Sequence, residues 1–309
     1  MTSKPAPHGI VLLDKPEGLT SNQALSRIKR LFGTKKAGHT GTLDPMATGL
    51  LVVCLGHATR VCAHLLEADK AYWADVHLGV VTDTEDKEGE VLETREVPPL
   101  SEADVEAVLA QFLGDLQQVP PMYSALKHKG ERLYDLARRG ESVERPPRAV
   151  TIHSLEVTEW RLTDSDRPGF AFEVTCSKGT YIRSLVRDIG ETLGCGAHLC
   201  GLRRTQASPF HIDQALTLNQ LESLSPEALF ESLLPIQAAL PDWPRVCLDR
   251  GAAGDFFHGR AIERARCDGV ETVQAGQWVC VLADGQRCIG LAEMGESALQ
   301  PRAVFPATS

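Results

Sequence analysis

The spacing of apolar residues predicts an amphipathic helix near the start of the chain. Thr20 and Ser21 can cap its N-terminus, and Gly33 can end it. Its other face carries Arg27 and Arg30, so we expect a basic surface there. The apolar positions recur at intervals of three and four, as one helix face requires, and are Ala24, Leu25, Ile28, Leu31 and Phe32.

Two strands are predicted after this helix, separated by a short helix over residues 59–66. Residues 50–55 are apolar without interruption, which is typical of a strand that is buried on both faces. From residue 72 to residue 80, apolar and polar side chains alternate, which predicts a strand with one buried face. Tyr72 lies on that apolar face.

Helices and strands then follow in mixed order. We interpret the acidic stretch after Val80 as an exposed loop or an edge hairpin, after which Ser101 and Asp104 form a capping pattern for a helix. Two strands joined by a polar turn are predicted over residues 150–160 and 170–176. A helix then runs from Ile182 to a stop at Gly194.

The last part of the chain changes in character. Thr217 and Ser225 cap short helical segments that extend to about residue 240, and prolines then form a linker. Short strands with Gly-containing turns are predicted beyond it, at residues 245–248, 277–282 and 288–294. We therefore expect two domains, residues 1–240 and residues 245–309, of which the second is small and rich in β-strands.

Residues 120–150 have the composition of an insertion that projects from the first domain. Pairs of prolines flank the segment, Lys129 and Gly130 form a turn, and a short basic helix is expected near residues 132–139. The segment holds seven basic and four acidic residues, a net charge of +3.

The composition is that of a globular protein. The chain has 309 residues, of which 43% are hydrophobic and 24% charged. Its apolar runs are far too short to span a membrane, and the first ten residues lack the apolar core of a signal peptide, so we expect a cytoplasmic protein.

The nine cysteines form no Cys-x-x-Cys pair, which argues against a disulfide framework. Cys195, His198 and Cys200 lack the two-pair spacing of a zinc site, and no metal is expected.

Charge is unevenly distributed along the chain. The formal net charge is −9, from 32 basic and 41 acidic residues. Residues 18–43 nevertheless carry five basic and no acidic side chains, whereas residues 83–106 carry ten acidic and two basic ones. An acidic protein of this kind can present a positive face to a nucleic acid, although ordinary solvated surface is the alternative.

Residues 38–49 form a loop in which chemistry can be expected. Three glycines, three threonines and a proline in twelve residues specify its backbone tightly. The loop lacks the Gly-Lys-Ser/Thr ending of a P-loop, so a nucleoside triphosphate site is disfavoured. Asp44 precedes Pro45, which keeps the aspartate out of the helical region. Taken alone, Asp44 would be an ordinary turn or cap residue.

Several motifs together resemble the bacterial TruB family of tRNA pseudouridine synthases. The resemblance extends in order from about Gly9 to Thr205. Its motifs are Leu13-Asp14-Lys15-Pro16, residues 38–51, Tyr123-Ser124-Ala125-Leu126-Lys127, Ser177-Lys178-Gly179-Thr180-Tyr181-Ile182-Arg183, Gly194-Cys195-Gly196-Ala197-His198-Leu199 and Leu202-Arg203-Arg204-Thr205.

The resemblance implies isomerisation of uridine 55 in the T loop of tRNA to pseudouridine, without metal or organic cofactor. Asp44 corresponds to the nucleophilic aspartate of that family. Its carboxylate can attack or stabilise C1′ as the glycosidic bond breaks, or can add to C6 of the base, and the sequence leaves both routes open. Arg183 corresponds to the arginine that pairs with the nucleophile, and is expected to lower the pKa of Asp44.

The resemblance also implies a pocket for a flipped base. Tyr72 matches the tyrosine that stacks on the uracil and takes part in proton transfer from C5, while Tyr181 and Leu202 match pocket positions. His39 matches a histidine that inserts beside the opened T loop. Arg203 and Arg204 are expected to contact phosphate or neighbouring acids. In the basic insertion, Lys127, Lys129 and Arg132 are expected to contact the tRNA backbone.

The implied architecture is a mixed α/β (α+β) fold. It comprises a largely antiparallel catalytic sheet flanked by helices, an RNA-binding insertion at about residues 120–150, and a PUA-like RNA-binding domain over residues 245–309. The expected partner is the T arm of tRNA, bound by a monomer. A tRNA chaperone activity is a rival or additional function, and an enzyme acting on ribosomal RNA or with a guide RNA is less favoured.

Overall fold

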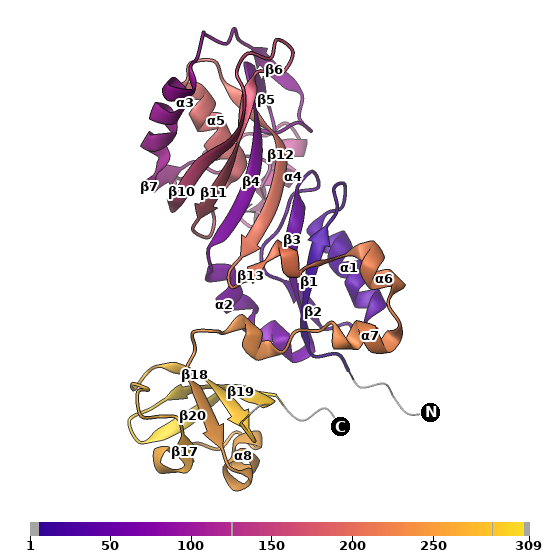
Figure 1. Ribbon diagram of the computed structural model, residues 1–309, viewed down its shortest axis with the longest axis vertical. Helices are drawn as coiled ribbons and strands as arrows, with labels where there is room; N and C mark the ends of the chain where they lie inside the picture. Colours follow the sequence, from indigo (N-terminus) through magenta and orange to yellow (C-terminus); the bar gives the residue numbers. More distant parts are fainter. Residues whose placement is uncertain (1–5, 125, 286, 306–309) are drawn as a thin grey trace.

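The computed structural model describes residues 6–124, 126–285 and 287–305 (Figure 1). These residues form one large sheet of ten strands, which runs β14-β1-β3-β12-β4-β11-β10-β7, with β13 on β12 and β2 on β3. The strands are β1 (Gly9–Lys15), β2 (Ala37–His39), β3 (Thr48–Leu55), β4 (Lys70–Leu78), β7 (Gly114–Gln118), β10 (Arg148–Arg161), β11 (Gly169–Cys176), β12 (Ala197–Ala207), β13 (Phe210–His211) and β14 (Leu216–Thr217).

The pairing in this sheet is mostly antiparallel. Among the described strands of this sheet, only β1 with β14 and β3 with β12 run parallel. The helices of this part are α1 (Ser21–Leu31), α2 (Cys62–Glu67), α3 (Glu102–Leu109), α4 (Leu133–Arg138), α5 (Ile182–Thr192), α6 (Leu218–Ser223) and α7 (Pro226–Glu231). The predicted mixed α/β class with a largely antiparallel sheet is therefore confirmed.

Local sequence signals account for the main helices. The Thr20 side chain accepts from the Gln23 backbone N–H and the Gln23 side chain accepts in return from Thr20, which closes a capping box at α1. Ser101 and Asp104 form the same motif at α3. The apolar face of α5 is buried against the sheet at Leu185, Val186 and Ile189. All three helices were predicted from their spacing and caps.

The central strand β12 was not predicted from the sequence pattern. It pairs with β4 on one side and β3 on the other, and so joins the two halves of the sheet. Its register shifts twice, between Leu199 and Gly201 and between Arg204 and Gln206. These irregularities break the alternation of inward and outward side chains, so no period of two appears in the sequence.

The acidic segment after β4 is only partly as predicted. It forms a hairpin of β5 (Val80–Thr82) and β6 (Val91–Thr94), but its turn is not an exposed loop. The Lys87 N–H donates to the Leu199 carbonyl and the Leu199 N–H donates to the Glu85 carbonyl, so the turn lies on β12. Asp86 is only 3% exposed as a result. The high charge of the segment had favoured solvent exposure.

The basic insertion contains a small hairpin followed by α4. β8 (Lys127–His128) and β9 (Glu131–Arg132) flank a turn at which Lys129 and Gly130 have positive φ angles of 51° and 94°. Leu133 and Leu136 of α4 are buried. The side chains of Lys127 and Arg132 lie outside the described part of the structure, as does Ala125.

A second sheet of six strands lies at the lower end of the molecule in Figure 1, in the order β16-β20-β19-β18-β15-β17. Its elements are β15 (Arg245–Leu248), α8 (Arg250–Phe257), β16 (Ile262–Glu263), β17 (Cys267–Asp268), β18 (Trp278–Ala283), β19 (Arg287–Met294) and β20 (Ala298–Val304). Helix α8 was not predicted. Leu291, Ala303 and Phe305 pack in one apolar cluster with Ile10 and Leu12 of β1, so this sheet shares buried surface with the first.

Neither membrane helices nor disulfides appear in the described chain. No helix among residues 6–124, 126–285 and 287–305 is long and apolar enough to cross a membrane. All nine cysteines are described, and each is a free thiol.

Gly49, at the start of β3, lies against the backbone of β12, where the two halves of the sheet are joined. A substitution at this position tests how closely the two strands must pack. Its φ angle is +98°, and an added Cβ would lie 2.3 Å from the Arg204 carbonyl oxygen on β12. We expect Gly49→Ala to lower the free energy of unfolding by at least about 3 kcal/mol, because strain and a backbone clash combine. Gly33→Ala is the control, since Gly33 has φ +62° and open space around it, and it should cost about 1–2 kcal/mol. Equal losses in denaturant unfolding would contradict the clash.

Candidate active site

The loop that carries Asp44 is held on both sides of the aspartate. Ser21, the first residue of α1, donates from its hydroxyl to the Leu43 carbonyl (3.0 Å) and accepts from the Leu43 N–H (2.8 Å). On the other side, the Pro45 carbonyl accepts from the Gly18 N–H at 2.8 Å. The amphipathic helix therefore positions the loop as well as covering the sheet.

A buried lysine reinforces this arrangement. Lys15, at the end of β1, is fully buried, and its ammonium donates to the carbonyls of Leu19 (2.7 Å), Pro16 (2.9 Å) and Pro45 (3.4 Å). Burial lowers the pKa of Lys15 to about 8, with Asp44 among the acids that oppose the shift. The sequence motif that contains Lys15 was recognised, but no role was predicted for this residue.

Arg183, in the first turn of α5, is the centre of the site. Its side chain is 5% exposed, and its Nη2 lies 3.0 Å from Oδ2 of Asp44. Nη1 lies 3.5 Å from Oδ2 of Asp86, and the guanidinium also donates to the carbonyls of Thr84 (3.0 Å) and Tyr123 (2.8 Å). One side chain therefore connects the loop, the acidic hairpin and the root of the basic insertion.

Asp86 is a residue of the site that sequence reasoning missed. Its carboxylate accepts from the Thr84 hydroxyl (2.6 Å) and from the Glu88 N–H (3.0 Å), in addition to facing Arg183. The available signal was the turn pattern Thr-x-Asp-x-x-Gly over residues 84–89, which differs from an undirected run of charge. The acidic composition around it concealed that pattern.

The pKa of Asp44 is raised, whereas Arg183 was expected from the sequence to lower it. Its side chain is 37% exposed, toward the cavity described below. Removal from bulk water raises the pKa of Asp44, and the nearby carboxylate of Asp86 raises it further, whereas Arg183 and Lys15 act in the opposite direction. The predicted effect of Arg183 thus has the correct sign, but desolvation outweighs it and the net shift is upward.

The strands β4 and β12 form the opposite wall of the site. Tyr72 projects from β4 and Leu202 from β12, and burial raises the pKa of the Tyr72 phenol. Arg204, which is 1% exposed, donates to the carbonyls of Leu50 (2.7 Å) and Gly41 (3.1 Å) and so supports the loop from below. Arg204 was expected to contact phosphate or neighbouring acids; its guanidinium lines the cavity beside Tyr72 and hydrogen-bonds backbone carbonyls. Arg203 does pair with an acid, Asp14, at 2.7 Å.

Tyr181 and His39 complete the wall. Gln118 of β7 accepts from the Tyr181 N–H (2.8 Å) and donates to its carbonyl (3.0 Å), which fixes the backbone just before α5. His39, on β2, has a buried Nδ1 without a hydrogen-bond partner among the described residues. Burial and the nearby Arg204 lower the pKa of His39, so its ring is neutral at pH 7.

These side chains surround one cavity of about 920 Å³. Six of the predicted site residues line it, namely His39, Asp44, Tyr72, Tyr181, Arg183 and Leu202. From the described part of the insertion, the lining includes Tyr134 and Arg138 but not Lys129, which is exposed at the hairpin turn. Four of the six predicted residues lie on β2, β4, α5 and β12, Asp44 lies in the loop after β2 and Tyr181 directly precedes α5, so only the fold brings the six together.

The geometry defines what the cavity can do. It presents a carboxylate beside a fixed guanidinium, with an aromatic ring and an aliphatic side chain across from it. A planar ring can stack on Tyr72 while the carboxylate approaches an electron-poor carbon next to the ring. Asp44 and Asp86 flank the same guanidinium, so Arg183 already supplies the positive charge between these two carboxylates.

Comparison with protein families gives consistent matches over most of the chain. Residues 29–182 match the family described as TruB family pseudouridylate synthase (N terminal domain). Residues 183–241 match the tRNA pseudouridylate synthase B C-terminal domain. Both matches lie within the part of the chain that contains the large sheet and the cavity.

Curated relatives and solved structures agree with these matches. The chain is 48% identical over 293 residues to tRNA pseudouridine synthase B of Burkholderia mallei, which covers 95% of each chain. It is 49% identical over 297 residues to the protein of that name from Cupriavidus metallidurans, covering 95% of this chain and 93% of the relative. A solved Cbf5-Nop10-Gar1 complex contains a chain with a TM-score of 0.72 at 27% identity, covering 98% of this chain and 86% of the other.

The network around Arg183 predicts opposite pKa shifts in two variants. Arg183→Gln should raise the pKa of Asp44 further, because it removes the nearby cation, whereas Asp86→Asn should lower it, because it removes a nearby anion. Carboxylate ¹³C NMR across a pH series measures both shifts. The Asp104 carboxylate, whose pKa is held low by hydrogen bonds from Ser101, serves as an internal control that should not move. Shifts of the same sign in both variants would contradict the proposed network.

Proposed function

Because this chain belongs to the TruB family of pseudouridylate synthases, we propose that it converts uridine 55 in the T loop of tRNA to pseudouridine, with Asp44 as the nucleophile. The activity in general terms, tRNA pseudouridylation by an isomerase, follows from the family. The observation that best supports the role of Asp44 is its pairing with the buried Arg183 at the wall of the cavity. We also propose that the protein acts as a monomer in the cytoplasm.

The reaction breaks the N1–C1′ bond, turns the uracil within the site and rejoins it through C5. An ionised Asp44 is needed whether its carboxylate attacks C1′ or adds to C6 of the base. Arg183 keeps this carboxylate oriented and partly compensates for its removal from water. Both routes require a nucleotide that has left the base stack, since C1′ and both faces of the base must be reachable.

The remaining residues of the cavity have roles in holding the flipped base. Tyr72 stacks on the uracil and assists proton removal from C5, while Leu202 and Tyr181 form the sides of the pocket. His39, uncharged and at the cavity wall, fills the space that the flipped nucleotide leaves in the T loop. Extrusion costs a few kcal/mol in lost stacking, and an inserted ring recovers part of that free energy.

A tRNA chaperone activity is a second candidate, supported by the same positive segments. Binding and refolding of the T arm would need basic surface and a site for an unstacked base, but no nucleophile. The two activities can therefore be separated by a variant that retains tRNA binding and loses chemistry.

Asp44→Asn is that variant. We expect it to abolish pseudouridine formation, because an amide cannot act as the nucleophile, and to keep tRNA affinity within about tenfold. Incubation with unmodified tRNA followed by mapping of pseudouridine at each position tests both the nucleophile and the site of modification. Wild-type product at a position other than 55 would refute the proposed specificity, and turnover by the variant would refute the nucleophile.

The basic insertion yields a separate prediction about binding. We propose that Lys127, Lys129 and Arg132 contact the tRNA backbone, since the segment carries +3 within a protein of charge −9. Replacing all three by Gln should weaken tRNA binding and reduce the slope of log affinity against log salt by about 2–3, because fewer counterions are released. Affinity measured at several salt concentrations provides the slope.

Arg139→Gln is the matched control for this experiment. Arg139 belongs to the same insertion, but its guanidinium is already paired with Glu131 and Glu141, both at 2.7 Å. Its replacement should change the slope much less than the triple variant does. An unchanged slope in the triple variant would move the phosphate contacts to the first basic segment, at Arg27, Arg30, Lys35 and Lys36.

A further inference from the structure

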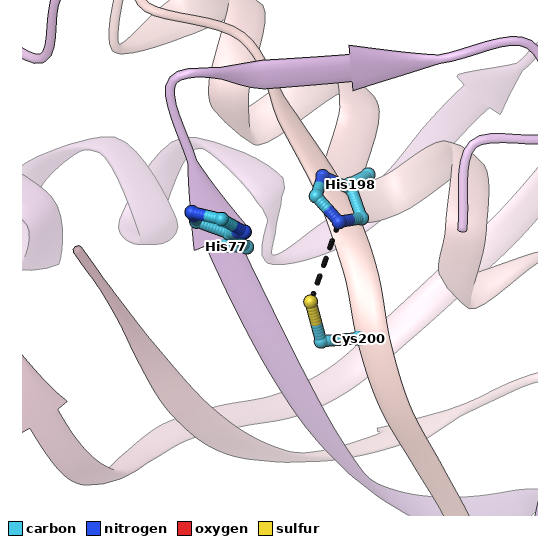
Figure 2. A group of neighbouring side chains, drawn as sticks. All are labelled: His77, His198 and Cys200. Carbon is cyan, nitrogen blue, oxygen red and sulfur yellow. Dashed lines mark hydrogen bonds between the residues drawn. The ribbon is translucent and has the colours of Figure 1, made fainter. Parts of the chain in front are cut away.

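A cluster of potential metal ligands lies outside the cavity. Its side chains come from the two neighbouring strands β4 and β12 of the large sheet. His77 on β4 is paired in register with His198 on β12, and Cys200 follows on β12 (Figure 2). The ligand atoms of the three side chains all lie within 4.8 Å of one another. We propose that His77, His198 and Cys200 form a binding site for one zinc ion.

The register of the two strands explains why these residues meet. His77 and Tyr72 are an odd number of positions apart on β4, so they project from opposite faces of the sheet. The cluster is therefore separated from the cavity by the sheet itself. Cys200 occupies the extra position of a bulge between Leu199 and Gly201, and it approaches His198 as a result.

The hydrogen bonds of His198 leave one nitrogen available for a metal. Nδ1 of His198 lies 2.9 Å from the Val80 carbonyl, which can only accept, so the ring proton resides on Nδ1. The lone pair of Nε2 then faces Sγ of Cys200 at 3.4 Å. An N–H bonded to a backbone carbonyl is the usual way in which proteins orient a metal-binding imidazole.

The spacing of the His198 and Cys200 ligand atoms matches tetrahedral zinc, and the His77 nitrogen lies within 4.8 Å of both. Zn–S bonds of about 2.3 Å and Zn–N bonds of about 2.0–2.1 Å place sulfur and nitrogen about 3.5 Å apart in a tetrahedron. The Nε2–Sγ distance of 3.4 Å agrees with this value. Zn²⁺ would replace the thiol proton of Cys200, which passes to solvent, and water would provide the fourth ligand. His77 and Cys200 are half-buried, so the ion has a path from solvent.

Neighbouring charges are compatible with a bound cation. Burial raises the pKa of the Cys200 thiol, and the adjacent Arg167 guanidinium opposes this shift. Asp75, on the same strand as His77, pairs with both Arg161 and Arg167, and Glu159 pairs with Arg161, so two carboxylates balance these two guanidinium groups. Cys195, which is close to His198 in the sequence, takes no part, because it is fully buried in the apolar core.

Cobalt titration of the full-length, reduced and chelator-treated protein tests the site. One equivalent of Co²⁺ should produce thiolate-to-cobalt charge-transfer absorption and the strong visible bands of tetrahedral cobalt, and Zn²⁺ should displace it. Cys200→Ser should abolish the charge-transfer band and weaken zinc binding at least about 100-fold. Zinc should also raise the midpoint of thermal unfolding of the wild-type protein but not of this variant.

Cys280→Ser is the control, because Cys280 belongs to a close thiol pair in the second sheet, with Sγ of Cys280 and Sγ of Cys288 3.2 Å apart. This variant should bind cobalt like the wild type. If Cys200→Ser does not fold, His77→Gln provides the same test from a half-exposed position. The proposal is overturned if the wild type gives no charge-transfer band, if the band survives both Cys200→Ser and His77→Gln, or if it disappears in Cys280→Ser.

Discussion

The site depends on the pairing of the buried Arg183 guanidinium with Asp44 and Asp86. A cation that is 5% exposed must be matched by anions and hydrogen-bond acceptors, since an unpaired buried charge costs several kcal/mol. Asp44, Asp86 and the carbonyls of Thr84 and Tyr123 provide this match. Three segments that are distant in sequence are therefore required to converge on α5.

This requirement also explains the position of the acidic hairpin. Its turn crosses β12 and is held there by backbone hydrogen bonds with Leu199. Asp86 can consequently face Nη1 of Arg183 while Asp44 faces Nη2, so the guanidinium is shared between two carboxylates. The nucleophilic carboxylate proposed here keeps an exposed edge of 37% toward the cavity. The acidic hairpin thus contributes Asp86 to the site, although the proposed substrate, tRNA, is itself negatively charged.

Strand β12 lines the cavity and also joins the two halves of the large sheet. On one face it contributes Leu202 to the cavity, and its Arg204 supports the backbone of residues 41 and 50. On the other face it carries His198 and, at a bulge, Cys200. The two register shifts of β12 remove the alternating pattern from its sequence. The shift at Cys200 also brings that thiol close to His198, so β12 contributes to both the cavity and the proposed zinc site.

The sequence by itself determined the elements whose signals are local. Caps and spacing located α1, α3 and α5, alternation located β4, and the motif resemblance selected the six residues that line the cavity. Only the tertiary structure decided that Asp86 is buried, that Arg204 binds carbonyls and that His77 meets His198. These outcomes depend on register and on pairing between distant segments, and such contacts leave no periodic pattern in the chain. Burial then sets the free energy of each charge, which is why the pKa of Asp44 rises although its nearest partner is a cation.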